Sequence, residues 1–293
     1  SMHRVHLILR SVINHLSLSE QKRLLESGQC SSSELIESHF KEIERRNPEI
    51  NAFVRLFSEE ARQAAKVPKP GPLSGLALTV KDSFDVEGFP TYGGTKQRLD
   101  HRAKKDSWAV QRLREAGAIL LGKTNTPEFL MNYESDNLIT GRTNHPADLS
   151  LTPGGSSGGE AAAIASFMSG GGVGSDGGGS IRWPAHCCGI VGLKPPPGRV
   201  PASGHFPTIA HPGGLLGVAG PMARTIEDTR MLFEVLQGHD INDPFSAPVA
   251  PPRISKEQIR VGVWPQFYKT PVQADCKNAV LESAQKLEQA GYI

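Results

Sequence analysis

The sequence of 293 residues predicts an α/β fold, in which helices and strands alternate along the chain and pack in layers. Short apolar runs typical of buried strands recur between segments whose apolar residues follow helical spacing. Serine, threonine and aspartate residues precede the helical segments, and glycines follow several of them. The composition, 38% hydrophobic and 21% charged, is that of a globular protein.

Residues 1–66 predict a helical segment that packs on the rest of the chain. Ser31 and Glu34 form a capping box before apolar residues at helical spacing, and Asn47-Pro48 is expected to end that helix. The other elements expected in this segment are a helix over residues 19–27, a strand over residues 51–57 and a helix over residues 58–66.

Residues 67–293 predict the core, and the two segments together are expected to form a single structural domain. Asp106 is expected to cap one core helix, and Thr126-Pro127-Glu128 to open another. The remaining core elements are strands over residues 76–80, 118–121, 190–193 and 260–263, and helices over residues 160–168, 181–188, 225–236 and 275–290. Because the last three residues are typical of entry into a further strand, we expect the core to be truncated at its C-terminus.

Net charge and residue types exclude several classes of function. A net charge of +2 provides no broad basic surface for nucleic acid or an anionic membrane. The four cysteines form no C-x-x-C pair and the ten histidines show no zinc spacing. We therefore expect no metal, and a reducing, cytoplasmic location. The apolar run over residues 5–13 is too short and too polar to span a bilayer.

Glycines and serines are concentrated in residues 152–201, where they suit close backbone approach or anion binding. A phosphate-binding P-loop is excluded, because G-x-x-x-x-G-K-[S/T] is absent. GGSSG at residues 154–158 matches the nucleophile elbow of α/β-hydrolases, with Ser156 as the nucleophile of an esterase. That elbow requires a strand directly before it, and residues 145–150 make a poor strand.

A third possible chemistry is acyl transfer by a serine with a lysine as base. Lys81 directly follows the apolar run over residues 76–80, and ligands gather at strand ends in α/β sheets. Burial lowers the pKa of a lysine and makes part of it neutral, as a base requires. Alternatively, Lys81 extends to solvent or pairs with the adjacent Asp82.

Several motifs, in this order, resemble the amidase signature family: TVKD at residues 79–82, GKTN at 122–125, GGSSGG at 154–159, DGGGSIRWPA at 176–185 and GIVGLKP at 189–195. The resemblance covers roughly residues 17–293. It implies an α/β/α sandwich around a mixed, mostly parallel sheet, with the N-terminal helices packed on it. It also implies a Ser–cis-Ser–Lys triad, in which Ser180 is the nucleophile, Ser156 follows a cis bond from Gly155, and Lys81 is the base.

The same resemblance assigns an oxyanion hole to the backbone N–H groups of Gly177, Gly178, Gly179 and Ser180. Glycine suits these positions, because a side chain there would obstruct the substrate carbonyl oxygen. The residues expected to support the loops are Ser157, Asp176 and Arg182.

Two apolar residues after the GKTN motif, Leu130 and Met131, either line an acyl channel or belong to the core of a helix. The chain departs from the family at two motif positions. Gly177 stands where threonine is frequent, and Glu160 where serine or alanine is frequent. Neither departure affects the implied triad.

Together these features predict an enzyme that hydrolyses a small-molecule amide without a cofactor and forms an acyl-enzyme on Ser180. A homodimer is possible. One alternative is the glutamine-hydrolysing subunit of a tRNA-dependent amidotransferase, which would require partner subunits. The stretch around Glu160 and residues 134–137 favours stand-alone amidases, including relatives of fatty acid amide hydrolase. A non-catalytic scaffold is disfavoured, because the implied triad residues are all present.

Overall fold

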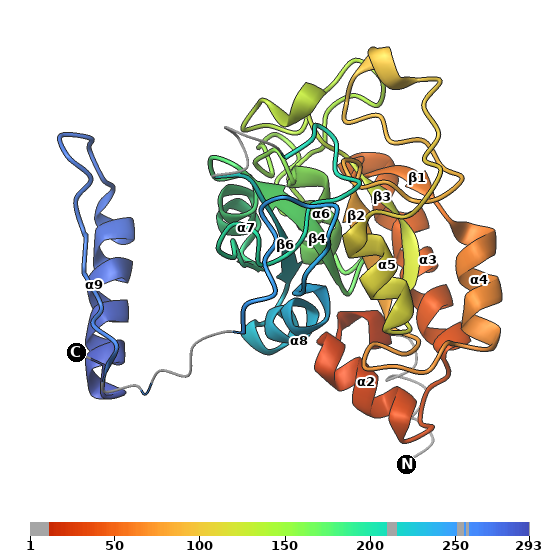
Figure 1. Ribbon diagram of the computed structural model, residues 1–293, viewed down its shortest axis with the longest axis horizontal. Helices are drawn as coiled ribbons and strands as arrows, with labels where there is room; N and C mark the ends of the chain where they lie inside the picture. The colour runs from red at the N-terminus through yellow and green to blue at the C-terminus, as the bar shows by residue number, and fades with distance from the viewer. Residues whose placement is uncertain (1–11, 210–215, 251–254, 256–257, 293) are drawn as a thin grey trace. The chain divides into compact units, whose positions relative to one another are not determined.

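The structure is a computed structural model that describes residues 12–209, 216–250, 255 and 258–292. The chain divides into two compact units, residues 1–248 and 249–293, and the first contains the sheet and its covering helices (Figure 1). The second contains helix α9 (Ala274–Gln289), close to the predicted bounds. The strand predicted over residues 260–263 is wrong, because these described residues pair with no strand. The boundary predicted at residue 66 stays a prediction.

Six strands of the described chain form one mixed sheet in the order β1-β3-β2-β4-β6-β5. The strands are β1 (Phe53–Leu56), β2 (Ala77–Lys81), β3 (Ile119–Thr124), β4 (Gly171–Asp176), β5 (Val191–Gly192) and β6 (Val218–Ala223). The central strands β3, β2 and β4 run parallel, whereas the outer pairs are antiparallel. The predicted mixed α/β sheet is therefore confirmed, and its parallel part lies at the centre.

Strands β4 and β6 are not predicted by the sequence. β4 reads Gly-Gly-Val-Gly-Ser-Asp, and glycine disfavours strands. A Cβ at Gly172 would collide with the backbone oxygen of Thr79 on β2 and with the carboxyl group of Glu160. Glycine is therefore required here by the close approach of neighbouring groups.

Helices cover both faces of the sheet, as the predicted sandwich requires (Figure 1). They are α2 (Leu18–Glu26), α3 (Ser32–Ile50), α4 (Ser58–Lys66), α5 (Trp108–Glu115), α6 (Gly158–Ala165), α7 (Arg182–Cys188) and α8 (Ile226–Leu236). Helices α5 and α8 share a hydrophobic cluster with Leu78 and Val80 of β2. Helices α3, α4 and α6 share a second cluster with Ala77 of the same strand. Alternate residues of β2 therefore face opposite helical layers.

The end predicted for helix α3 is wrong, because the helix continues through Pro48 to Ile50. Both capping-box hydrogen bonds between Ser31 and Glu34 are present at its start. Near its end, the side-chain oxygen of Asn47 accepts hydrogen bonds from the N–H groups of Ala52 and Phe53, at 2.8 and 3.1 Å. These contacts help to stabilise the last turn, in which proline lacks an N–H donor.

Two further predicted helix starts are corrected. Ser107, not Asp106, caps α5, because the Asp106 carboxylate instead accepts from the Glu87 N–H and pairs with Arg114. The helix predicted from Thr126-Pro127-Glu128 is only a 3₁₀ turn, η3 (Glu128–Leu130). Its residues Phe129 and Leu130 have positive φ angles, 51° and 65°, which an α-helix does not allow.

Candidate active site

Lys81 ends strand β2 and is fully buried. Its Nζ donates hydrogen bonds to Ser156 Oγ at 2.6 Å and to Ser175 Oγ at 3.2 Å. Burial lowers the pKa of this amine well below its ordinary value, although the charges of Asp176 and Glu160 act in the opposite direction. A neutral fraction of the amine can therefore accept a proton from the adjacent serine.

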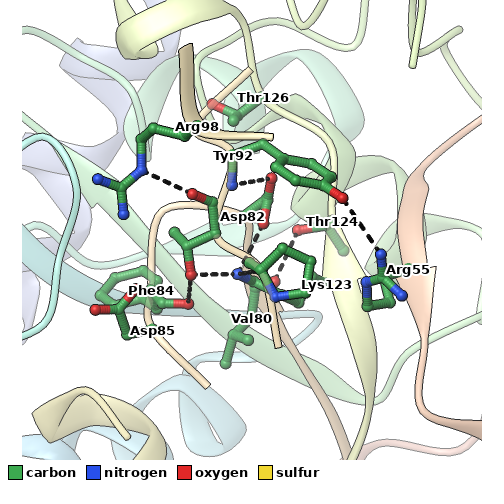
Figure 2. A network of polar contacts seen from close by, with 12 residues as sticks. Arg55, Val80, Asp82, Phe84, Asp85, Tyr92, Arg98, Lys123, Thr124 and Thr126 are labelled. Atoms are coloured by element: carbon green, nitrogen blue, oxygen red, sulfur yellow. Dashed lines mark hydrogen bonds and ion pairs between the residues drawn. The ribbon is translucent and has the colours of Figure 1, made fainter. Parts of the chain in front are cut away.

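Asp82 does not pair with Lys81, since its carboxylate lies 2.7 Å from Lys123 in a buried ion pair (Figure 2). The Lys123 ammonium also donates to Pro90 O and Thr91 Oγ1, each at 2.8 Å. Burial raises the pKa of Asp82 and lowers that of Lys123, and the ion pair opposes both shifts. Lys123 thus neutralises Asp82 and leaves the Lys81 amine to the serines.

The loop before helix α6 brings Ser156 to Lys81. The Gly155–Ser156 peptide bond is cis, as the resemblance implies, and Ser156 is buried. Ser135 Oγ accepts from the Gly158 N–H at 2.9 Å and donates to the loop carbonyl oxygens. No strand precedes this loop within described residues 145–153, so the geometry of an α/β-hydrolase elbow is not present.

Ser157 connects this loop to the following one. Its backbone N–H donates to Ser180 O at 3.1 Å, and its hydroxyl donates to Ser175 O at 3.3 Å. These bonds fix Ser180 relative to helix α6 and to strand β4. The supporting role predicted for Ser157 therefore has a structural basis, although its effect on chemistry stays a prediction.

Asp176 holds the glycine loop that follows β4. Its carboxylate accepts from the N–H groups of Gly179 and Ile181, at 2.8 and 3.1 Å, and pairs with Arg182 at 2.9 Å. Burial alone would raise the pKa of Asp176, but the Arg182 side chain and these N–H donors lower it to about 2. The carboxylate is therefore ionised at neutral pH and stabilises the turn that carries Ser180.

One predicted oxyanion donor needs correction. The Gly179 N–H already donates to Asp176, so it does not point to a substrate. No hydrogen bond joins the N–H groups of Gly177, Gly178 or Ser180 to another described residue. These three groups remain available as donors to a substrate carbonyl oxygen.

Ser180 and Ser156 line one cavity of about 490 Å³. Ser180 is half-buried, and no hydrogen bond joins its hydroxyl to another described residue. Leu130 and Met131 also line the cavity, and Met131 is 85% exposed, so it is not a core residue. The structure thus brings the two predicted triad serines and the residues predicted for the acyl channel together around one cavity, and the buried Lys81 contacts it through Ser156.

Sequence reasoning missed much of the cavity wall, which comes from loops far apart in the chain. The additional lining residues include Phe129, Tyr133, His205, Pro207, Ile209 and Val218. The Tyr133 hydroxyl donates to Gly178 O at 3.1 Å. Burial lowers the pKa of His205 to about 3, so its ring is neutral at neutral pH. No motif marks these residues, because only folding brings their loops together.

Among the described residues, no group of three histidine, cysteine, aspartate or glutamate side chains is arranged to hold a metal ion. None of the helices found there is both long and apolar enough to cross a membrane.

Comparisons with known proteins agree on the family. The family model described as Amidase matches residues 34–293. The chain is 36% identical over 288 residues to a subunit of the glutamyl-tRNA(Gln) amidotransferase of Salinibacter ruber, covering 94% of this chain and 55% of that protein. It is 37% identical over 287 residues to indoleacetamide hydrolase of Bradyrhizobium diazoefficiens, covering 92% and 53%.

A solved structure of fatty acid amide hydrolase superposes with a TM-score of 0.86 at 28% identity, covering 97% of this chain and 52% of that one. The chain thus spans about half the length of the relatives it matches.

Proposed function

Because this chain belongs to the amidase signature family, we propose that it hydrolyses carboxylic amides through an acyl-enzyme on Ser180. The observation that carries the proposal is the 2.6 Å hydrogen bond between the buried Lys81 amine and Ser156, which shares a cavity with Ser180. A serine needs such a base, because its hydroxyl is a weak nucleophile at neutral pH.

In the proposed reaction, neutral Lys81 takes the hydroxyl proton of Ser156 while Ser156 takes that of Ser180. The Ser180 oxygen forms a bond to the amide carbon, and the resulting oxyanion accepts hydrogen bonds from the N–H groups of Gly177 and Gly178. The C–N bond then breaks as the proton returns through Ser156 to the leaving nitrogen. Water attacks the acyl-enzyme by the same proton route and releases the carboxylic acid.

The cavity wall favours an apolar, uncharged amide. Among its described residues the wall contains no lysine or arginine, and its one carboxylate, Asp176, is already paired with Arg182. Free glutamine carries an α-carboxylate and an α-ammonium, and burying them without partners would cost several kcal/mol. The apolar residues Phe129, Leu130 and Val218 instead suit an aryl or alkyl acyl group.

A second candidate is the glutamine-hydrolysing component of an amidotransferase, which the likeness to the Salinibacter ruber protein supports. That function would require partner subunits. Ammonia release from glutamine, measured for the chain alone and with candidate partner subunits, separates the two. Hydrolysis of glutamine but not of aryl or alkyl amides would overturn the apolar-substrate proposal.

A fluorophosphonate probe followed by peptide mapping tests the nucleophile. We expect covalent labelling at Ser180 in the wild type and none in Ser180→Ala. The Ser156→Ala variant should still be labelled at Ser180, but more slowly, because the proton route is interrupted. Labelling of the wild type at Ser156, or at no serine, would contradict the assignment.

A further inference from the structure

Glu160 is a fully buried carboxyl group on helix α6 that the proposed mechanism does not use. Thr79 Oγ1 and Thr124 Oγ1 donate to its two oxygens, the latter at 2.6 Å. Gly172 of β4 leaves the space that this carboxyl group occupies, since a Cβ there would collide with Glu160 Oε1. Three neighbouring strands therefore contribute to one site for this carboxyl group.

This site lies on the same side of strand β2 as Lys81. Residues of a strand alternate between faces, so Thr79 and Lys81 both point toward the layer that contains α6. Thr79 binds Glu160 in the first turn of α6, and Lys81 binds Ser156 just before that helix begins. The carboxyl group and the amine are thus both fully buried on one side of β2.

The charged and titratable groups near Glu160 and Lys81 differ in their charge at neutral pH and in their counter-ions. Asp176 of β4 also acts on the Lys81 charge, but its ion pair with Arg182 of α7 and its pKa of about 2 keep it ionised throughout the neutral range. His205 of the cavity wall has a pKa of about 3 and is neutral at neutral pH. Among the described residues, Glu160 is bound by hydroxyl groups and by no cation, so its charge acts on Lys81.

The hydroxyl groups around Glu160 accommodate either protonation state. Thr79 Oγ1 lies 2.9 Å from Ser169 Oγ, which donates to Gly171 O at 2.9 Å. An ionised Glu160 accepts a hydrogen bond from the Thr79 hydroxyl. A neutral Glu160 instead donates a hydrogen bond to Thr79, which then donates to Ser169. Burial raises the pKa of Glu160 to about 7, while the hydroxyl donors and Lys81 lower it.

We propose that Glu160 is a positioning residue that sets the pH range in which Lys81 is a neutral base. The inference rests on the proposed role of Lys81 and adds a carboxyl group that acts on its amine. An ionised Glu160 favours the ammonium form of Lys81, so it delays the appearance of the neutral amine as pH rises. Removing that charge should allow Lys81 to act at lower pH.

The test measures the rate of fluorophosphonate labelling of Ser180 between pH 5 and 10 in the full chain. We expect the acid limb of Glu160→Gln to move to lower pH by about one unit, the effect of one charge at several ångströms in a protein interior. The plateau rate at high pH should stay within a few fold of the wild type, which a general loss of structure would not produce.

Asp228→Asn is the matched control, because Asp228 is also a buried helix carboxylate but caps α2 through the N–H groups of Leu18 and Ser19. Its profile should coincide with that of the wild type. If Glu160→Gln does not fold, Glu160→Ser removes the same charge with a side chain that is smaller. Coincident acid limbs for the wild type and a folded Glu160 variant would overturn the inference.

A second measurement separates this inference from the proposed function. The unfolding free energy of the wild type relative to Lys81→Met should rise with pH from the folded-state pKa of Lys81 up to that of an unfolded lysine. In the Glu160→Gln background this rise should begin at lower pH. An unlabelled Ser180 would overturn the proposed function, whereas an unmoved rise would overturn only the role of Glu160.

Discussion

Replacing Asp176 by asparagine should destabilise the protein at neutral pH and slow the labelling of Ser180. The carboxylate accepts hydrogen bonds from three backbone N–H groups and from the Arg182 side chain. An asparagine keeps one oxygen but turns the other acceptor into an NH₂ group, which faces donors. The loop that carries Ser180 therefore loses part of the network that holds it.

The pKa of Asp176 gives the size of the stability loss expected for Asp176→Asn. It falls from an ordinary value of 3.8 to about 2, which at about 1.4 kcal/mol per pH unit corresponds to roughly 2 kcal/mol. The Arg182 side chain is 55% exposed, and solvent screening reduces the expected loss to about 1–2 kcal/mol. Because the folded-state pKa is depressed, this stabilisation is complete above pH 3.8 and disappears as pH falls through about 2.

The assay combines urea denaturation at pH 7, 5 and 3 with fluorophosphonate labelling of Ser180 at pH 8. We expect the stability difference between wild type and Asp176→Asn to be equal at pH 7 and 5 and smaller at pH 3. Labelling should slow by about 10²-fold, the cost of a misplaced reacting group. Asp106→Asn, which breaks the ion pair with Arg114 away from the cavity, should leave labelling unchanged. Equal stability at pH 7, or unchanged labelling in Asp176→Asn, would refute the reasoning.

Three other substitutions test the surroundings of the site. Lys81→Met should slow labelling of Ser180 by about 10²–10⁴-fold. In urea denaturation at neutral pH it should be more stable than the wild type, because burial depresses the pKa of the wild-type lysine. This gain in stability should shrink as pH approaches 10.5. Lys123→Met leaves Asp82 buried without its cation and should cost about 3–5 kcal/mol; a double-mutant cycle with Asp82→Asn should recover part of it. Gly172→Ala should lower the melting temperature because its Cβ collides with Glu160 and with Thr79 O. Part of that loss should disappear in the Glu160→Ser background, which removes the first collision but not the second; additive losses would contradict this.

The sequence predicts elements well where hydrophobic spacing decides them. Helix α4 has the predicted bounds, residues 58–66, and β2 differs from the prediction by one residue at each end. Strand β4 escapes prediction, because its glycines reflect what lies against them rather than strand propensity. A Cβ at Gly172 or Gly174 would collide with groups of helix α6 or of the loop before it, and only the folded structure reveals this.

For the site, the motifs locate Lys81, Ser156 and Ser180, but spacing alone does not show which groups contact them. The alternative pairing of Lys81 with Asp82 does not occur, because Asp82, in the turn after β2, pairs with Lys123. Lys123, 41 positions further on, provides the counter-ion through parallel pairing of β2 with β3. The cavity wall from Tyr133 and His205 was not predictable, because no local pattern connects residues in irregular loops.

The three buried carboxyl groups near the end of β2 differ in one respect that matters for the base. Asp82 is paired with Lys123 and Asp176 with Arg182, so each largely cancels a neighbouring positive charge. Glu160 is bound only by hydroxyl groups among the described residues, and its pKa of about 7 lets its charge change near neutral pH. Of the three, it is therefore the carboxyl group whose titration near neutral pH can be transmitted to Lys81, because Asp176, with a pKa of about 2, stays ionised there and Asp82 is held in its ion pair with Lys123.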